Sequence, residues 1–494
     1  MKNDKFFKII TPEEGGISSG DIEKMINVIE KRGICLHSYL ILKGDSIVSE
    51  GYYPPFDEKY KHRMYSVSKS FVGTAVGALI DEGKLSLDDK VHTFFPDKIP
   101  PEGLHKYVEN TTIRDLLTMC SPFETDAYAP CTANMDWAWT FFNTKPNHPS
   151  GTVFKYDTCG TYMLDVIVER ITGKPYMTYL YERVLKYLGF SEDTWCVKSP
   201  EGYSWGGSGV MATLRDLARL GYLYMRKGNI NGKQILSEKY ANDAVSRLVN
   251  PANGCSASPY SKGYGYQIWC TDEGFAFIGM GGQLCFAFPE KDIIFCVNGD
   301  NQGNAAAYHV IYHTFEDYVL NKLSDNPLPE NKKAYESLLT KINNLKLPVP
   351  NGITYSHLAD KINGKWIKCN RNPMGISKYK LVFQEDEGVF IYDTVRGVKQ
   401  IKFGLGKHII STFPEKHYFA EQINVPSGRE LRCTAAANWY CEDELTLRCY
   451  IIDTCFGNCT ISFGFNGDRV SLIMNKTAEW FMNEYQGVAG GYIC

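Results

Sequence analysis

Hydrophobic residues recur every three or four positions in several stretches before residue 325, a period typical of amphipathic helices. The clearest stretch runs from Phe71 to Ile80, and Gly83 stands where such a helix would end. A second lies at 22–29, and a third at 163–171 ends at Gly173. Thr112 begins a short capped helix.

Other stretches alternate apolar and polar positions, which predicts strands. Apolar runs at 40–42 and 47–48 flank a polar turn and predict a hairpin. After Gly263 the same reasoning predicts four strands, at 264–268, 275–278, 284–288 and 292–297, followed by a closing helix at 305–323. The order of hairpin, long helical insertion, strand meander and helix predicts an α+β fold, an antiparallel sheet flanked by helices with a helical subdomain.

Beyond Asn351 the chain reads mostly as short strands, which predicts a C-terminal β-rich barrel or sandwich. We therefore expect domains at 1–325 and 351–494, joined by a linker with a short helix at 326–350. The C-terminal region shows no catalytic constellation. Its expected role is to form a homo-oligomer or to cover one side of a cleft.

Composition excludes several classes of function. Of 494 residues, 44% are hydrophobic and 22% charged, with a net charge of −3 and no basic block, so nucleic acid and anionic membranes are not expected partners. No apolar run is long enough to span a bilayer. The N-terminus lacks the apolar core of a signal peptide, and the 16 cysteines are scattered, which indicates reduced thiols and a cytoplasmic location.

No metal or cofactor is predicted. His309 and His313 have the spacing of helix ligands, but Val310 stands where the metalloprotease pattern requires Glu. Cys455 and Cys459 resemble half a metal site without a second half.

The candidate chemistry centres on Ser66 and Lys69. A serine hydroxyl needs a nearby base to act as a nucleophile, and a lysine one helical turn away can serve if it is desolvated. A chain of this length is expected to contain about two Ser-x-x-Lys patterns by chance. The other match, at 377–380, precedes a predicted strand that would turn its two side chains to opposite faces, so we reject it.

Other polar and aromatic residues extend this candidate site. Tyr156 lies just before the third helix, and a phenol near a lysine can shuttle protons. Ser208, in a tight turn, either touches substrate or serves the turn itself. The aromatic residues between 120 and 150 form either a packed surface flap or a cleft wall.

Three ordered blocks carry a family resemblance: Ser66-Val67-Ser68-Lys69, 149–158 with Tyr156, and Gly279-Met280-Gly281-Gly282-Gln283. With them, residues 1 to about 325 resemble the serine β-lactamase and penicillin-binding-protein-like hydrolases. The likeness is to the class C branch, which includes esterases, D-amino-acid peptidases and 6-aminohexanoate-dimer hydrolases.

The resemblance implies a role for each matching position. Ser66 would be the acylated nucleophile, Lys69 its activating partner and Tyr156 the general base and acid. The oxyanion hole would be the backbone N–H groups of Ser66 and Gly282. The positions expected to contact substrate are Thr158, Ser208, Gly279, Met280, Gly281 and Gln283.

Two departures from the family pattern bear on the substrate. The tyrosine motif usually continues to Asn where this chain has Thr158. Where β-lactamases place Lys-Thr-Gly, this chain has Gly279–Gly281, without the cation that would hold a substrate carboxylate. The sequence thus predicts a serine hydrolase that cleaves an ester or amide of a small molecule or short peptide. The alternatives are a D-stereospecific peptidase or β-lactamase, and a catalytically silent sensor on the same fold.

Overall fold

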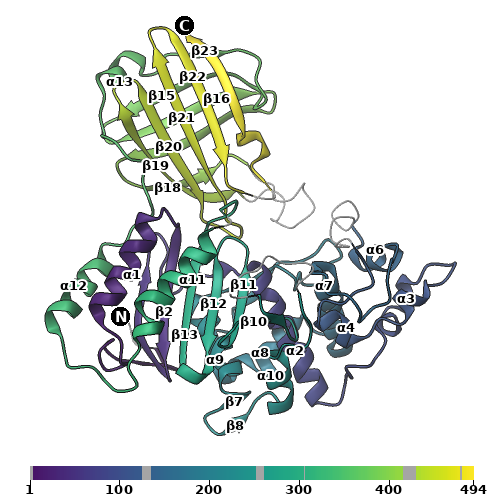
Figure 1. The fold of residues 1–494 in the computed structure, drawn as a ribbon. Coiled ribbons are helices and arrows are strands. Elements are labelled where there is room, and N and C mark those ends of the chain that lie inside the picture. The colour runs from purple at the N-terminus through teal and green to yellow at the C-terminus, as the bar shows by residue number, and fades with distance from the viewer. Residues whose placement is uncertain (1–3, 125–134, 252–260, 305, 416–429, 479–480) are drawn as a thin grey trace. The chain divides into compact units, whose positions relative to one another are not determined.

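The computed structural model describes residues 4–124, 135–251, 261–304, 306–415, 430–478 and 481–494. The chain forms two compact units. The first comprises Met1–Gly299 and Ala306–Lys346, and the second Asp300–Ala305 and Leu347–Cys494. Figure 1 shows the elements of each unit along the chain.

The first unit is built on an eight-stranded sheet in the order β1-β3-β2-β13-β12-β11-β10-β9. Its pairs are antiparallel except β1–β3. The strands are β1 (Lys8–Ile9), β2 (Leu36–Lys43), β3 (Ser46–Tyr52), β9 (Gly263–Tyr264), β10 (Trp269–Cys270), β11 (Phe275–Gly279), β12 (Gln283–Phe288) and β13 (Ile293–Gly299).

Helices cover both faces of this sheet, which explains why β13 is apolar at successive positions. Phe295 stacks on Phe315 of α11 (Ala307–Tyr318) at 4.3 Å. The adjacent Ile294 lies beside Gly221 of α9 (Leu214–Met225). Because neighbouring strand residues point to opposite faces, α11 and α9 lie on opposite sides of the sheet.

The helical region consists of packed helices between β3 and β9. Its members are α2 (Ser68–Asp81), α3 (Lys106–Glu109), α4 (Ile113–Leu117), α6 (Trp137–Asn143), α7 (Thr158–Thr172), α8 (Tyr176–Arg183) and α10 (Glu238–Ala244). Thr112 caps α4 with a reciprocal capping box, and Gly173 ends α7 in the left-handed conformation, both as predicted. A small sheet of β4 (His62–Arg63), β6 (Val210–Ala212) and β5 (Trp195–Cys196) joins distant parts of this region.

One sequence expectation for this unit needs correction. Of the strand predicted at 264–268, only Tyr264 lies in a strand, at the end of β9, and the rest is the turn before β10, in which Gln267 has a φ of 62° and the Gly265 N–H donates to the Ile268 carbonyl. The segment 326–350 contains α12 (Lys332–Asn343), which packs on α1 (Ser19–Lys31) within the first unit.

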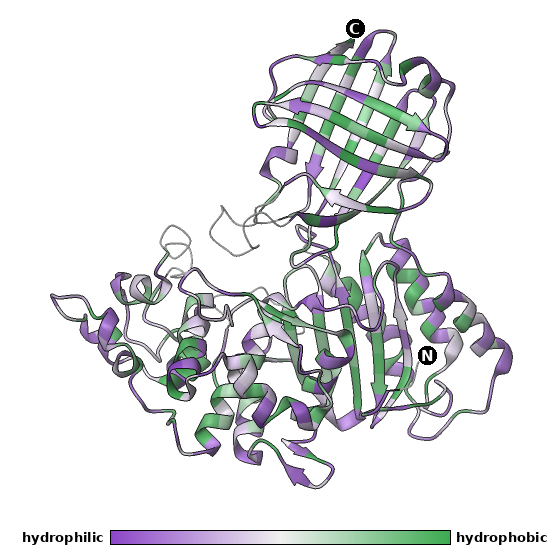
Figure 2. Ribbon diagram, turned by 180° about the vertical axis from the view of Figure 1, so that it is seen from behind, coloured by the Kyte–Doolittle hydropathy of each residue, from purple (hydrophilic) through white to green (hydrophobic). Residues whose placement is uncertain are grey.

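The second unit is a closed β-barrel of nine strands. Strands β17, β16, β15, β14, β23, β22, β21, β20 and β19 pair in this order, and β17 also pairs with β19 through Gly404–Ala436 and Leu405–Ala437. Figure 2 shows hydrophobic and hydrophilic residues mixed along the barrel strands. In β22 the buried Val470, Leu472 and Met474 alternate with exposed residues, so the inward positions are apolar. Of the two predicted alternatives, the barrel is therefore correct.

The bounds of these strands are β14 (Ile367–Cys369), β15 (Ile376–Gln384), β16 (Glu387–Thr394), β17 (Gly397–Leu405), β18 (Ile409–Phe413), β19 (Leu431–Cys441), β20 (Glu444–Ile451), β21 (Asn458–Asn466), β22 (Arg469–Lys476) and β23 (Gly487–Ile493). A short helix, α13 (His357–Ile362), precedes them. The rejected Ser-x-x-Lys match lies in β15, as expected.

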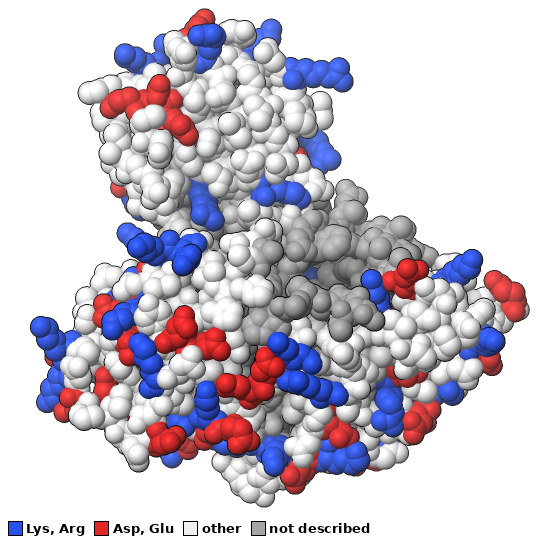
Figure 3. Space-filling view, in the orientation of Figure 1, with Lys and Arg blue, Asp and Glu red and all other residues white. Residues whose placement is uncertain are grey.

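Charges of both signs are interspersed on the face shown in Figure 3. No helix among the described residues is both long and apolar enough to cross a membrane.

Candidate active site

Ser66 lies in a single 3-10 turn, Tyr65–Val67, directly before α2. Two hydrogen bonds to Val210 hold this segment: the Met64 N–H donates to the Val210 carbonyl at 2.8 Å, and the Ser68 hydroxyl accepts from the Val210 N–H at 3.0 Å. Tyr65 has a φ of 45°, a conformation that costs a bulky residue about 1–2 kcal/mol. The backbone immediately before Ser66 is therefore strained and held in place by β6.

Lys69 reaches back to Ser66 as the spacing predicts. Its Nζ donates to Ser66 Oγ at 3.2 Å and to the Gly207 carbonyl at 2.7 Å. The Lys69 side chain is almost wholly buried, whereas Ser66 is half-buried. A lysine in such a setting is desolvated and fixed beside the hydroxyl that it would activate.

Tyr156 completes the group. Lys69 Nζ lies 5.0 Å from the centroid of the Tyr156 ring. Two aromatic rings also contact it: Trp269 stacks on it at 5.7 Å with an interplanar angle of 16°, and Tyr264 meets it edge-on at 6.4 Å. The fold thus brings Tyr156 to a serine and a lysine that lie far before it in the chain, and the end of the sheet at β9–β10 orients the phenol ring.

The turn between β11 and β12 borders the Ser66 segment. A Cβ atom on Gly279 would lie 2.4 Å from the Met64 carbonyl oxygen, so only glycine allows the strand to approach so closely. The close approach that Gly279 permits is therefore to the protein's own backbone. The hydroxyl of Tyr308, in α11, donates a hydrogen bond of 3.0 Å to the Gly279 carbonyl.

The two predicted oxyanion donors differ in their surroundings. The N–H of Ser66 precedes the first hydrogen bond of its 3-10 turn, which runs from Val67 N–H to the Met64 carbonyl. The N–H of Gly282 donates to the Gly279 carbonyl at 3.2 Å, within the β11–β12 turn. Because the Gly282 N–H already donates within this turn, Ser66 is the better supported of the two predicted oxyanion donors.

Gln283, which the sequence predicts to contact substrate, also supports the β11–β12 turn. Its side chain is fully buried and donates to the carbonyls of Gly299 at 2.8 Å and Met280 at 3.1 Å. These hydrogen bonds fix the turn. Met280, by contrast, is half-buried at the tip of the turn, and Gly281 beside it is buried.

Arg63, a buried residue that the sequence gave no reason to select, connects the Ser66 segment to the turn at Ser208. Its guanidinium lies over the rings of Trp205 at 4.4 Å and Tyr65 at 5.0 Å, and its Nε donates to the Ser208 carbonyl at 3.0 Å. Ser208 is half-buried, and its hydroxyl lies 3.5 Å from Arg63. Thr158, the first residue of α7, packs against Gly207.

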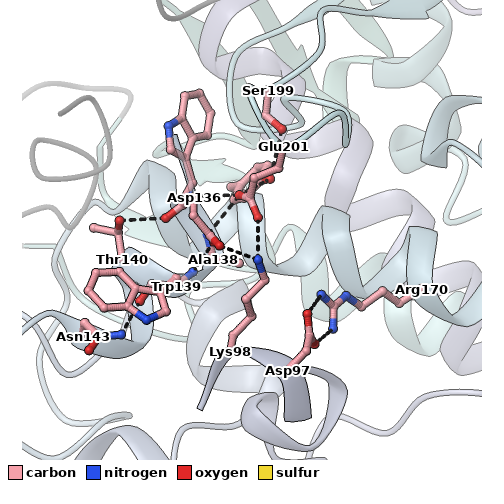
Figure 4. A network of polar contacts seen from close by, with 12 residues as sticks. Asp97, Lys98, Asp136, Ala138, Trp139, Thr140, Asn143, Arg170, Ser199 and Glu201 are labelled. Atoms are coloured by element: carbon pink, nitrogen blue, oxygen red, sulfur yellow. Dashed lines mark hydrogen bonds and ion pairs between the residues drawn. The ribbon is translucent and has the colours of Figure 1, made fainter. Parts of the chain in front are cut away.

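The aromatic segment before α7 is packed against the helical region. Trp137, Phe141 and Phe142 of α6 are buried and Trp139 is exposed. Figure 4 shows how the start of α6 is held: Glu201 accepts from the N–H groups of Trp137 and Ala138, and Lys98 bridges Glu201 and Asp136. The described part of this segment is thus a packed element, and 125–134 lie outside the described residues.

Two buried histidines brace the strand that leads to Ser66. A ring nitrogen of His37 shares a hydrogen bond of 3.1 Å with one of His62. Burial lowers the pKa of His62 to about 3 and that of His37 well below its usual value. Both rings are therefore neutral at neutral pH.

Neither the pair His309 and His313 nor the pair Cys455 and Cys459 belongs to a metal site in the part of the chain that is described. No group of three or more His, Cys, Asp or Glu side chains is placed there to hold an ion. His313 instead pairs with Glu316 at 2.9 Å on the exposed side of α11.

This fold is that of the β-lactamase and penicillin-binding-protein-like hydrolases. It is similar to the structure of a Bacillus anthracis protein provisionally assigned as a 6-aminohexanoate-dimer hydrolase. The TM-score is 0.52 and the identity 20%, over 66% of this chain and 89% of that one. A model of the Beta-lactamase family matches residues 33–310, and the chain belongs to this family.

The relatives that are similar in sequence include the following two proteins. The 6-aminohexanoate-dimer hydrolase of Paenarthrobacter ureafaciens is 27% identical over 58% of this chain and 78% of its own length. Protein flp of Staphylococcus aureus is 27% identical over 32% of this chain and 34% of its own length. The family and the first relative together indicate a hydrolase.

Proposed function

We propose that the protein is a serine hydrolase that cleaves an ester or amide bond of a small molecule or short peptide through an acyl-enzyme on Ser66. The observation that carries the proposal is the convergence of three groups: the Ser66 hydroxyl, the Lys69 amine 3.2 Å from it, and the Tyr156 ring beside that amine. Nucleophile, base and a second proton carrier are what acyl transfer requires.

The reaction proceeds in two halves. Ser66 Oγ attacks the carbonyl carbon while its proton passes to the Lys69–Tyr156 pair, and the Ser66 N–H stabilises the tetrahedral oxyanion. The pair then returns a proton to the departing alcohol or amine, which leaves the acyl group on Ser66. Water attacks this ester, its proton passes to the same pair, and Ser66 is released with the acid product.

Burial of Lys69 supports the acylation of Ser66, because a desolvated amine loses its proton more readily than one in water. The family's other members support a hydrolase in general, and the chain's lack of Lys-Thr-Gly at Gly279–Gly281 favours substrates without a carboxylate at that end. We further propose a reducing, cytoplasmic setting, since Cys285 and Cys296 face each other across β12 and β13 as thiols.

A fluorophosphonate probe tests the assignment of the nucleophile. We expect the probe to label the wild-type chain at Ser66 and to leave Ser66→Ala unlabelled. Ser70→Ala is the matched control, since Ser70 lies on the same helix but its hydroxyl donates to the Gln267 carbonyl. Labelling of Ser66→Ala at the wild-type rate would exclude the mechanism.

Mass spectrometry after exposure to a p-nitrophenyl ester separates turnover from a stalled acyl-enzyme. An enzyme releases free acid and returns to its original mass, whereas a sensor stays acylated or unreacted. Turnover of nitrocefin, which we expect to be slight, distinguishes a β-lactamase.

A further inference from the structure

A buried carboxyl group lies behind the turn that holds Lys69. Asp165 occupies the middle of α7 and is fully buried. Its Oδ2 accepts a hydrogen bond of 2.7 Å from the Gly206 N–H, and its Oδ1 has no hydrogen-bond partner among the described residues. A buried carboxyl group with one unsatisfied oxygen is costly, so its retention points to a role.

The turn from Trp205 to Ser208 has little freedom to move. A Cβ atom on Gly206 would lie 2.5 Å from Val72 of α2 and 2.7 Å from Oδ2 of Asp165. The turn is thus packed between α2 and α7, and the hydrogen bond from the Gly206 N–H to Asp165 fixes its distance from α7. The carbonyl of the next residue, Gly207, accepts a hydrogen bond of 2.7 Å from Lys69 Nζ, which is shorter than the 3.2 Å hydrogen bond from Nζ to Ser66 Oγ.

We propose that Asp165 is a positioning residue, whose carboxyl group holds the Trp205–Ser208 turn so that the Gly207 carbonyl meets Lys69. The inference rests on the proposed function, since it assigns Asp165 to the orientation and proton affinity of the lysine that activates Ser66. The hydrogen bond from the Gly206 N–H connects Asp165 to the turn, and the Gly207 carbonyl connects the turn to Lys69.

The carboxyl group performs this role in its neutral form. Burial, and then the nearby Glu169, raise the pKa of Asp165 well above its usual value. Asp165 also interacts electrostatically with four other ionisable groups, those of Lys198, Tyr162, Tyr176 and Cys196. A neutral acid beneath the turn keeps an acceptor for Gly206 without adding a negative charge, which would hold Lys69 in its protonated, inactive form.

Two substitutions separate this role from simple packing. Asp165→Asn is neutral and keeps an oxygen for the Gly206 N–H, so it should behave like the wild type. Asp165→Ala removes the acceptor and releases the turn. Glu169→Gln is the control: Glu169 lies one turn further along α7 and anchors Ser204 of the same loop, with its Oε1 2.5 Å from the Ser204 hydroxyl, but it does not bind Gly206.

The first measurement is the pKa of Lys69, followed by NMR of ¹³Cε-labelled lysine and assigned with Lys69→Arg. It is independent of any hydrolase activity. We expect a pKa about one unit lower in Asp165→Ala, because the ammonium loses an acceptor, and a wild-type value in Asp165→Asn and Glu169→Gln. An unchanged pKa in Asp165→Ala, or an equal change in all three variants, would overturn the proposal.

The second measurement is the rate of fluorophosphonate labelling as a function of pH. The limb of the profile governed by Lys69 should shift in Asp165→Ala and stay in place in Asp165→Asn. If Asp165→Asn behaves like Asp165→Ala, the carboxyl group acts as a charge and the neutral role is wrong. If wild-type Ser66 is not labelled at all, the proposed function fails, while the NMR titration still decides whether Asp165 positions Lys69.

Discussion

The Nζ of Lys69 lies 5.0 Å from the centroid of the Tyr156 ring, on a side chain that also reaches Ser66 Oγ at 3.2 Å. One amine therefore contacts both the predicted nucleophile and the predicted second proton carrier. Because Lys69 and Tyr156 lie so close together, we expect them to transfer the proton as a coupled pair, and we assign neither alone as the base.

Removing the phenol hydroxyl should slow the reaction without disturbing the fold. For Tyr156→Phe we expect kcat/KM for a p-nitrophenyl ester to fall by about 10²–10⁴-fold, the usual contribution of a general acid–base. The ring contacts with Trp269 and Lys69 remain possible in this variant, so the melting temperature should stay close to that of the wild type. Activity within a few fold of the wild type would show that Lys69 works without the phenol.

A methyl group at Gly279 should displace the Ser66 segment. The Cβ of Gly279→Ala would stand 2.4 Å from the Met64 carbonyl, a distance that forces one backbone to move. We expect fluorophosphonate labelling to slow by at least about tenfold, because misplaced reacting groups lose much of their rate advantage. Gly20→Ala, in α1, is the control, since a Cβ there meets nothing closer than 3.7 Å and should leave labelling unchanged. Equal labelling of the two variants would contradict this account.

Acid should destabilise the first unit through its buried histidines. The pKa of His62 in the folded chain is lowered to about 3 from an ordinary 6.5. The unfolded chain therefore binds more protons below pH 6.5, and the stability contributed by the neutral ring is present above that pH and lost as pH falls. Hydrogen exchange of β2 and β4, corrected for intrinsic rates, should show declining protection between pH 6.5 and about 4.5. His62→Gln should reduce this decline, and an unaltered slope would refute the assignment.

The second unit should respond in the opposite direction. Asp300 is buried and accepts hydrogen bonds from Asn458 at 2.8 Å and Gln302 at 3.0 Å, and burial raises its pKa from 3.8 to about 6. Because the folded chain holds this proton more tightly, the stability that it contributes is present at low pH and lost as pH rises to about 6, by at most about 3 kcal/mol. Protection of β21 should therefore fall as pH rises from about 4 to 6, and Asp300→Asn should abolish the trend. A trend that persists in Asp300→Asn would assign it to another group.

In the second unit, the apolar pattern predicts strands at 379–383, 389–392, 400–403, 407–412, 445–452, 459–465 and 469–473, but it misses two long ones. β19 contains Ala435, Ala436 and Ala437, and β23 contains Gly490 and Gly491. Alanine and glycine have little preference for strands, so nothing local marks these segments. They are strands because neighbouring strands pair with them on both sides and close the barrel.

The sequence by itself determined the helices with a strong apolar period, the three motif blocks and the serine and lysine one turn apart, because each depends on residues close together in the chain. It did not reveal Arg63, Asp165 or the burial of Gln283, whose partners lie far away along the chain. Only the tertiary structure decided that Tyr156 lies beside Lys69 and that Gly207 binds the amine. Such contacts arise from the packing of α2, α7 and the sheet against one another, and no local pattern encodes a distance between segments that meet only when the chain is folded.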